Sequence, residues 1–166
     1  FLENSPIQLS VDQSREEIIA AIQTQRQANA TVDLAFYAFR EMETCDWKPF
    51  VKAAIERNPV SLAMTESMTI EQVHAWVGEM ESASIYDGNR LAQPDEVANY
   101  GRGDGLEKAF LLANVLRHRN PEQELTLSVD ESRVTLSAAS AFEFTSAKHL
   151  HRQLDFFQDG EMRVTR

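Results

Sequence analysis

Cysteine is nearly missing from this sequence: Cys45 is the only one among 166 residues. A single cysteine excludes an intramolecular disulfide and any metal site built from several cysteine ligands. Cysteines outside disulfides are among the most buried side chains, so we expect Cys45 to be buried and inert. The sequence also contains no internal repeat and no low-complexity tract.

Long apolar runs and an excess of positive charge are missing as well. No stretch approaches the roughly 18 apolar residues that a membrane-spanning helix needs, so no membrane span is predicted. The 16 Lys and Arg residues are outnumbered by 26 Asp and Glu residues, which gives a net charge of −10. Nucleic-acid binding is therefore not predicted, because it requires a basic stripe or patch.

The N-terminus carries neither an initiator methionine nor a visible secretory leader, since the chain begins at Phe1. We expect a processed product or a domain from a longer protein. Residues 1–10 are predicted to be extended or mobile, because Pro6 disfavours a helix. The sequence indicates neither a cellular compartment nor an oligomeric state.

Length and composition fit one domain spanning residues 1–166, with 43% hydrophobic residues. Apolar residues recur at helical spacing in the first half of the chain. This periodicity predicts helices over residues 12–28, 32–42, 46–57 and 69–80, and a short helical turn over 94–99. Residues 60–64 are predicted to form a short strand or an extended link.

A central helix is predicted over residues 104–118, directly after a glycine-rich loop. Asp104 suits the N-cap position, and Glu107 stands where a capping box requires it. Asn120 and Pro121 end the helix. One buried face is expected, formed by the apolar residues Leu106, Ala109, Phe110, Ala113 and Leu116.

After Pro121 the apolar period changes from helical to alternating, which predicts an antiparallel sheet of about five short strands. A turn is expected at residues 130–132, and Asp159 with Gly160 signals a hairpin. Helices followed by strands indicate an α+β fold.

The loop and helix also resemble a known motif. The chain has Pro94, Glu96 and Val97 upstream, then Gly103-Asp104-Gly105, Glu107-Lys108-Ala109 and Leu116-Arg117. These residues are similar to the core motif of the transglutaminase-like superfamily of papain-like cysteine enzymes. In that motif Gly-Asp-Cys precedes an acidic residue and Lys-Ala, and Gly105 occupies the position of the nucleophilic cysteine.

The resemblance implies a helix that starts at a cleft and packs against a following sheet. It marks Gly103, Asp104, Gly105 and Lys108 as cleft candidates, with no catalytic role for any of them. A family enzyme needs the thiol and a histidine on a following strand. The matching strand, residues 132–137, contains no histidine. The resemblance therefore implies a catalytically inactive domain, without a cofactor, that binds a protein or peptide or has a structural role.

The histidines leave other interpretations open. His74-Ala75-Trp76-Val77 is similar to the family's histidine motif but precedes Gly105, and we expect His74 to be an exposed helix residue with Trp76 and Val77 in the core. His149 and His151 would share one face of a strand, as metal ligands do, but no third ligand is evident. A cysteine hydrolase or acyl-transfer enzyme rearranged around Cys45 and these histidines is the alternative. An anion-binding glycine loop is a third possibility.

Overall fold

A computed structural model describes residues 10–25, 29, 31–32, 34–35 and 40–165. The chain divides into two compact units, residues 1–41 and 42–166, which we describe separately. The first contains α1 (Arg15–Thr24), which starts at a capping box formed by Ser14 and Glu17. Residues 1–9 of the expected lead-in, and residues 33 and 36–39 of the helix expected over 32–42, lie outside the described residues.

The second unit is an α+β fold. Its elements in chain order are α3 (Trp47–Glu56), α4 (Pro59–Thr65), α5 (Ile70–Glu79), α6 (Pro94–Tyr100), α7 (Gly105–Arg119), β1 (Leu125–Ser137), β2 (Ala141–Phe156) and β3 (Met162–Thr165). The helices predicted at Asp46, Thr69 and Pro94 are confirmed. Asp46 and Thr69 cap α3 and α5 with their side chains, and Thr69 forms the expected capping box with Gln72.

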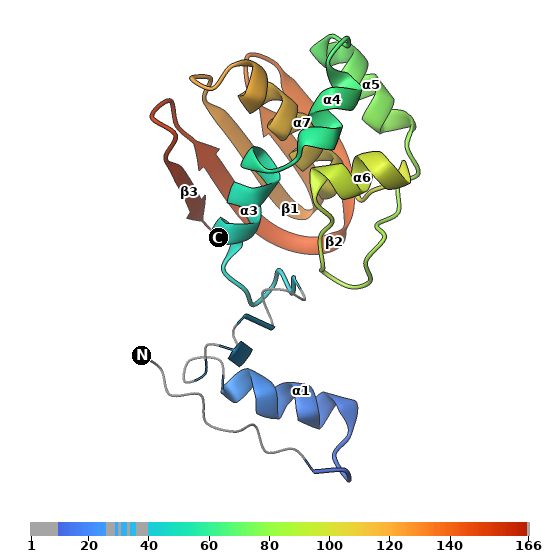
Figure 1. The fold of residues 1–166 in the computed structure, drawn as a ribbon, viewed down its shortest axis with the longest axis vertical. Helices are drawn as coiled ribbons and strands as arrows, with labels where there is room; N and C mark the ends of the chain where they lie inside the picture. Colours follow the sequence, from blue (N-terminus) through green and yellow to red (C-terminus); the bar gives the residue numbers. More distant parts are fainter. Residues whose placement is uncertain (1–9, 26–28, 30, 33, 36–39, 166) are drawn as a thin grey trace. The chain divides into compact units, whose positions relative to one another are not determined.

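Helix α7 is the centre of this unit. It contacts α3, α4, α5 and α6 as well as strands β1 and β2, as Figure 1 shows. Every residue from Gly105 to Leu116 is buried, including Glu107, Lys108 and Asn114. The predicted helix is confirmed, but the expectation of one buried face is wrong, because neighbouring elements cover α7 on all sides.

The prediction for residues 60–64 is also wrong, because they lie in α4. Pro59 occupies the first turn, where its missing N–H costs nothing. The backbone N–H groups of Val60 and Ser61 donate to the two carboxylate oxygens of Asp95, at 3.0 and 2.7 Å. The cap comes from residues distant in sequence, so the local pattern did not reveal it.

The described residues form one antiparallel sheet of three strands in the order β1-β2-β3, not about five short strands. The turn expected at residues 130–132 is instead part of the continuous strand β1, at a point where its pairing with β2 shifts. Glu131 has a φ of 54° there, and the pairing shifts from Glu131 with Leu150 to Arg133 with Thr145. Strand β2 therefore has four unpaired residues, 146–149, at this point, opposite a single residue of β1. The Asp159–Gly160 hairpin is confirmed between β2 and β3.

No helix in the described part of the chain combines the length and the apolarity that crossing a membrane requires.

Candidate functional site

The start of α7 contains the candidate residues Gly103, Asp104, Gly105 and Lys108, and its capping is local. Leu106 N–H donates to the Asp104 carboxylate at 2.9 Å, and Asp104 N–H donates to the Glu107 carboxylate at 2.7 Å. This is the predicted capping box. Its two acidic side chains are buried, so each must find further donors.

The further donors to Asp104 lie on β2. The Ser146 hydroxyl donates to one carboxylate oxygen at 2.6 Å, and Ala147 N–H donates to the other at 2.7 Å. Both donors belong to the four unpaired residues of β2 at the shift in its pairing with β1. The irregularity in β2 therefore brings its backbone over the N-terminus of α7.

Gly105 lies directly under this stretch of β2. A Cβ atom built on Gly105 would stand 2.2 Å from the Thr145 carbonyl oxygen and 2.6 Å from the carbonyl carbon. Non-bonded atoms do not approach so closely, and both obstacles belong to the backbone. Glycine is therefore required here by close packing, because this position has no room for a side chain.

Glu107 holds the loop that precedes α6. It accepts hydrogen bonds from the Ser84 hydroxyl at 2.6 Å and from Ala92 N–H at 2.8 Å. Burial raises the pKa of Glu107 above its ordinary value, while these hydrogen bonds and the one from Asp104 act in the opposite direction. The carboxylate therefore serves as an internal acceptor for three segments of the chain.

Two buried lysines hold neighbouring parts of the same loop. Lys108 Nζ donates to the Met80 carbonyl at 2.7 Å, and Lys148 Nζ donates to the carbonyls of Tyr86 and Gly88 at 2.8 and 2.9 Å. Burial lowers the pKa of both ammonium groups. The sequence analysis missed Ser146 and Lys148, because nothing in a strand pattern marks a polar side chain that points inward at a bulge.

The candidate residues therefore come together in the interior. Gly103, Asp104, Gly105 and Lys108 are all buried, and the polar atoms of Asp104 and Lys108 bind the backbone and neighbouring hydroxyl groups. This arrangement joins α7, β2 and the loop at residues 80–92.

The histidines occupy other places. The expectation that His74 is exposed is wrong: its half-buried ring packs against Phe142 and Phe144, with centroid distances of 5.1 and 5.3 Å. Trp76 of the same motif is only half-buried, whereas Val77 is in the core as expected. His118 is exposed in the last turn of α7.

His149 and His151 are both exposed on β2. His149 Nδ1 is 3.1 Å from a Glu131 oxygen, and His151 bridges Asp130 and Glu131 at 2.8 and 3.1 Å. The hydrogen bond with Asp130 is the main cause of the raised pKa of His151. Within the described ranges, no group of three or more His, Cys, Asp and Glu side chains has an arrangement that could hold a metal ion.

Cys45 is buried, as predicted. Its thiol donates to the Met42 sulfur at 3.7 Å.

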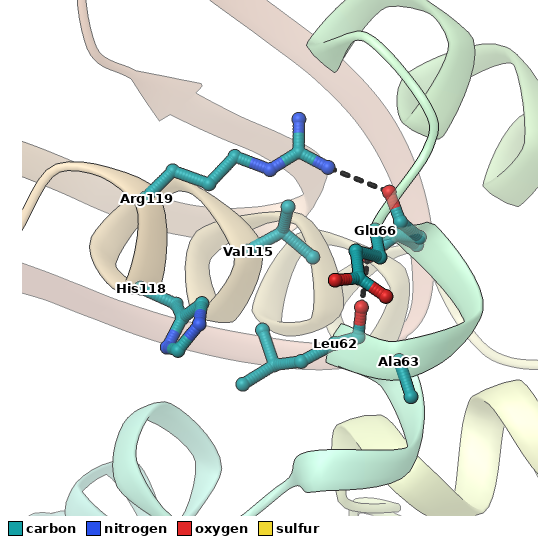
Figure 2. A pocket seen from close by; sticks show the side chains of 7 residues that line it. Leu62, Ala63, Glu66, Val115, His118 and Arg119 are labelled. Atoms are coloured by element: carbon teal, nitrogen blue, oxygen red, sulfur yellow. Dashed lines mark hydrogen bonds between the residues drawn. The ribbon is translucent and has the colours of Figure 1, made fainter.

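A groove of about 470 Å³ lies between α4 and the C-terminal end of α7 (Figure 2). Leu62 and Val115 lie between His118 on α7 and Glu66 on α4. The Arg119 guanidinium crosses to α4 and donates to the Thr65 carbonyl at 2.7 Å. The groove is therefore lined by both polar and apolar side chains, and Glu66 and Arg119 bring charges of both signs to it.

Comparisons with known proteins give no match: no family model matches the chain, and neither the curated proteins nor the solved structures include a significant relative.

Proposed function

We propose that this chain is a catalytically inactive relative of the transglutaminase-like enzymes and acts as a binding or structural module for a protein or peptide. The motif residues Gly103, Asp104 and Gly105 stand at the start of a buried helix that packs against a following antiparallel sheet. That placement is the one the family motif has, which supports the relationship.

The observation that carries the proposal is the packing of Gly105 against the Thr145 carbonyl. A cysteine nucleophile needs a side chain at this position and open space beside it for the substrate carbonyl. Here the backbone of β2 fills the space that even a Cβ atom would occupy. Cys45, the only cysteine in the sequence, is buried, and its thiol donates to the Met42 sulfur.

The polar groups at the start of α7 support the same conclusion. In an active site, acidic and basic side chains are held ready for a substrate, and some of their hydrogen-bonding capacity faces the cleft. Asp104, Glu107 and Lys108 instead direct their polar atoms at backbone groups and hydroxyls of the protein. Their hydrogen bonds stabilise the fold.

A turnover assay tests the inactive part of the proposal. We expect no multiple turnovers by the wild-type chain in amine-transfer or peptide-hydrolysis assays, and none by the Gly105→Cys variant. That variant lacks a histidine to accept and return the proton, a contribution of roughly 10²–10⁴-fold in enzymes that have one. A Cys45→Ser variant is the control.

Multiple turnovers by the wild type that Cys45→Ser abolishes would overturn the proposal. They would favour the alternative, a cysteine hydrolase or acyl-transfer enzyme with a rearranged site.

A further inference from the structure

Strand β2 makes contacts on two sides where its pairing with β1 shifts. Of its four unpaired residues, 146–149, the first two bind the Asp104 carboxylate at the start of α7. Lys148 binds two carbonyl groups of the loop before α6. The fourth residue, His149, is exposed and has its partner on β1. The segment 146–149 therefore connects the cap of α7 with side chains on the surface of the sheet.

Four exposed side chains form a cluster beside this segment. We call them the charged cluster: Asp130 and Glu131 of β1 with His149 and His151 of β2. One Glu131 oxygen lies 3.1 Å from His149 Nδ1, and the other lies 3.1 Å from His151 Nε2. The remaining ring nitrogen of His151, Nδ1, lies 2.8 Å from an Asp130 oxygen. Glu131 thus links the two histidines, and His151 links the two acids.

The contacts of His151 define the protonation state that they require. An ionised carboxylate only accepts hydrogen bonds, so a ring nitrogen that bonds to it must carry a hydrogen. A neutral imidazole has one N–H group, whereas the charged ring has two. Both contacts of His151 are therefore hydrogen bonds only when the ring is charged. The raised pKa of His151, caused mainly by the hydrogen bond with Asp130, agrees with this requirement.

The backbone at the charged cluster has an uncommon conformation. Glu131 and His149 have φ angles of 54° and 51°, in the left-handed region that residues with a Cβ atom seldom adopt. Such conformations persist where the surrounding contacts hold them. The side chains of these same two residues contact each other. Their contact ties β1 to the last residue of the segment 146–149.

We propose that the charged cluster is a pH-sensitive clamp, which holds the segment 146–149 against the start of α7 while His151 is charged and loosens it once that ring is neutral. Loss of the proton removes one of the two hydrogen bonds of His151 and its attraction to both acids. Glu131 then keeps only its contact with His149. This inference goes beyond the proposed function, because it concerns access to the start of α7 and not what the chain binds.

Other charged groups act on the segment from its inner side. Lys148 interacts electrostatically with three carboxylates and one guanidinium, those of Glu107, Asp104, Asp87 and Arg90. On the outer side, the charged groups that act on His151 are the two acids of the cluster. A response caused by the inner groups would not follow the titration of the His151 ring. The midpoint of the response therefore identifies the group responsible.

Amide hydrogen exchange of the full chain tests the inference, followed by NMR from about pH 5 to about pH 8, the range in which histidine titrates. The Ala147 amide reports on the segment, because it donates to Asp104. Its protection factor, which corrects for the intrinsic pH dependence of exchange, should fall by about two- to fivefold as His151 becomes neutral, as expected for exposed ion pairs. Ala147 should also be less protected than Leu154, which pairs with both β1 and β3.

Two matched variants assign the effect to His151. His151→Gln cannot become charged, so the protection of Ala147 should be low and independent of pH. His118→Gln makes the same substitution at an exposed histidine in the last turn of α7, outside the cluster, and should keep the fall seen in the wild type. In the wild type, the amide shifts of residues 146–149 should titrate with the same midpoint as the ring protons of His151.

A protection factor of Ala147 that stays constant over the pH range would overturn the inference. So would a fall of equal size in His151→Gln, or a midpoint different from that of the His151 ring. Equal protection of Ala147 and Leu154 at every pH would also contradict it, because the segment would then open only when the whole unit unfolds. Each of these results leaves the inactive-module proposal intact, because that proposal depends on the turnover assay.

Discussion

Gly105 shows how one residue can be fixed by a contact that its neighbours in sequence do not reveal. Its Cα faces the Thr145 carbonyl, and an added methyl group would overlap backbone atoms. We expect Gly105→Ala to lower the free energy of unfolding by about 1–3 kcal/mol or more, as overpacking does in a tight core. Urea unfolding followed by circular dichroism measures the change.

Gly78→Ala is the matched control for this prediction. Gly78 lies in α5 with no heavy atom within 4 Å of an added Cβ. The same substitution should there leave stability unchanged or raise it by up to about 1 kcal/mol, since alanine is the better helix former. An equal effect of the two substitutions would mean that Gly105 is not closely packed.

The residues that were predictable and those that were not differ in the range of their interactions. The capping residues Ser14, Thr69 and Asp104 could be identified because each bonds backbone groups two or three positions ahead. Ser146 and Lys148 could not be identified, because their partners lie on other elements. The local pattern places the motif at the start of a helix but does not show that β2 covers it.

At the scale of the element, α7 is the part whose burial matters most. Phe110 is completely buried and packs edge-to-face on Phe50 of α3, with ring centroids 5.4 Å apart. Phe110→Ala should lower the free energy of unfolding by about 3–5 kcal/mol, because it removes a buried ring and leaves a cavity. A loss below about 1 kcal/mol in urea unfolding would contradict the packing of α7, given that range. Phe157→Ala, at a half-buried position, should cost clearly less.

Asp130 and Glu131 of β1 form a charged cluster with the histidines of β2 where the strand pairing shifts. This cluster leads us to expect a pH-dependent contribution to stability. His151 has a pKa raised above its ordinary value of 6.5, chiefly by the hydrogen bond with Asp130. The stabilisation from this pair is therefore full below the unfolded-state pKa and is lost as pH rises through the folded-state pKa. Asp130→Asn should lower the pKa of His151 toward its ordinary value.

An NMR titration of the histidine ring protons measures this shift. Asp159→Asn removes the same charge from the β2–β3 hairpin and should leave the pKa of His151 nearly unchanged. If the two variants shifted it equally, the effect would come from net charge and not from the hydrogen bond.

At the scale of the molecule, the change from helical to alternating periodicity after Pro121 was sufficient to predict an α+β fold. Strand number was not predictable, because Asp130, Glu131 and Ser132 have turn-forming composition whether a chain reverses or only bulges. The orientation of α4, which buries Ser61 and Thr65 and exposes Met64, was also not predictable. A short segment with a proline, two hydroxyl residues and several apolar residues does not show which side will meet α7.

The hydrogen bonds from Ser146 and Ala147 to Asp104 have a consequence for the order of folding. They join residues 42 and 43 positions apart, and contacts of large sequence separation form slowly. The carboxylate at the first turn of α7 stays open to water until the middle of β2 has been made. Closure of the helix start therefore requires the chain as far as residue 147, and a chain ending before residue 146 would lack both donors that β2 supplies to Asp104.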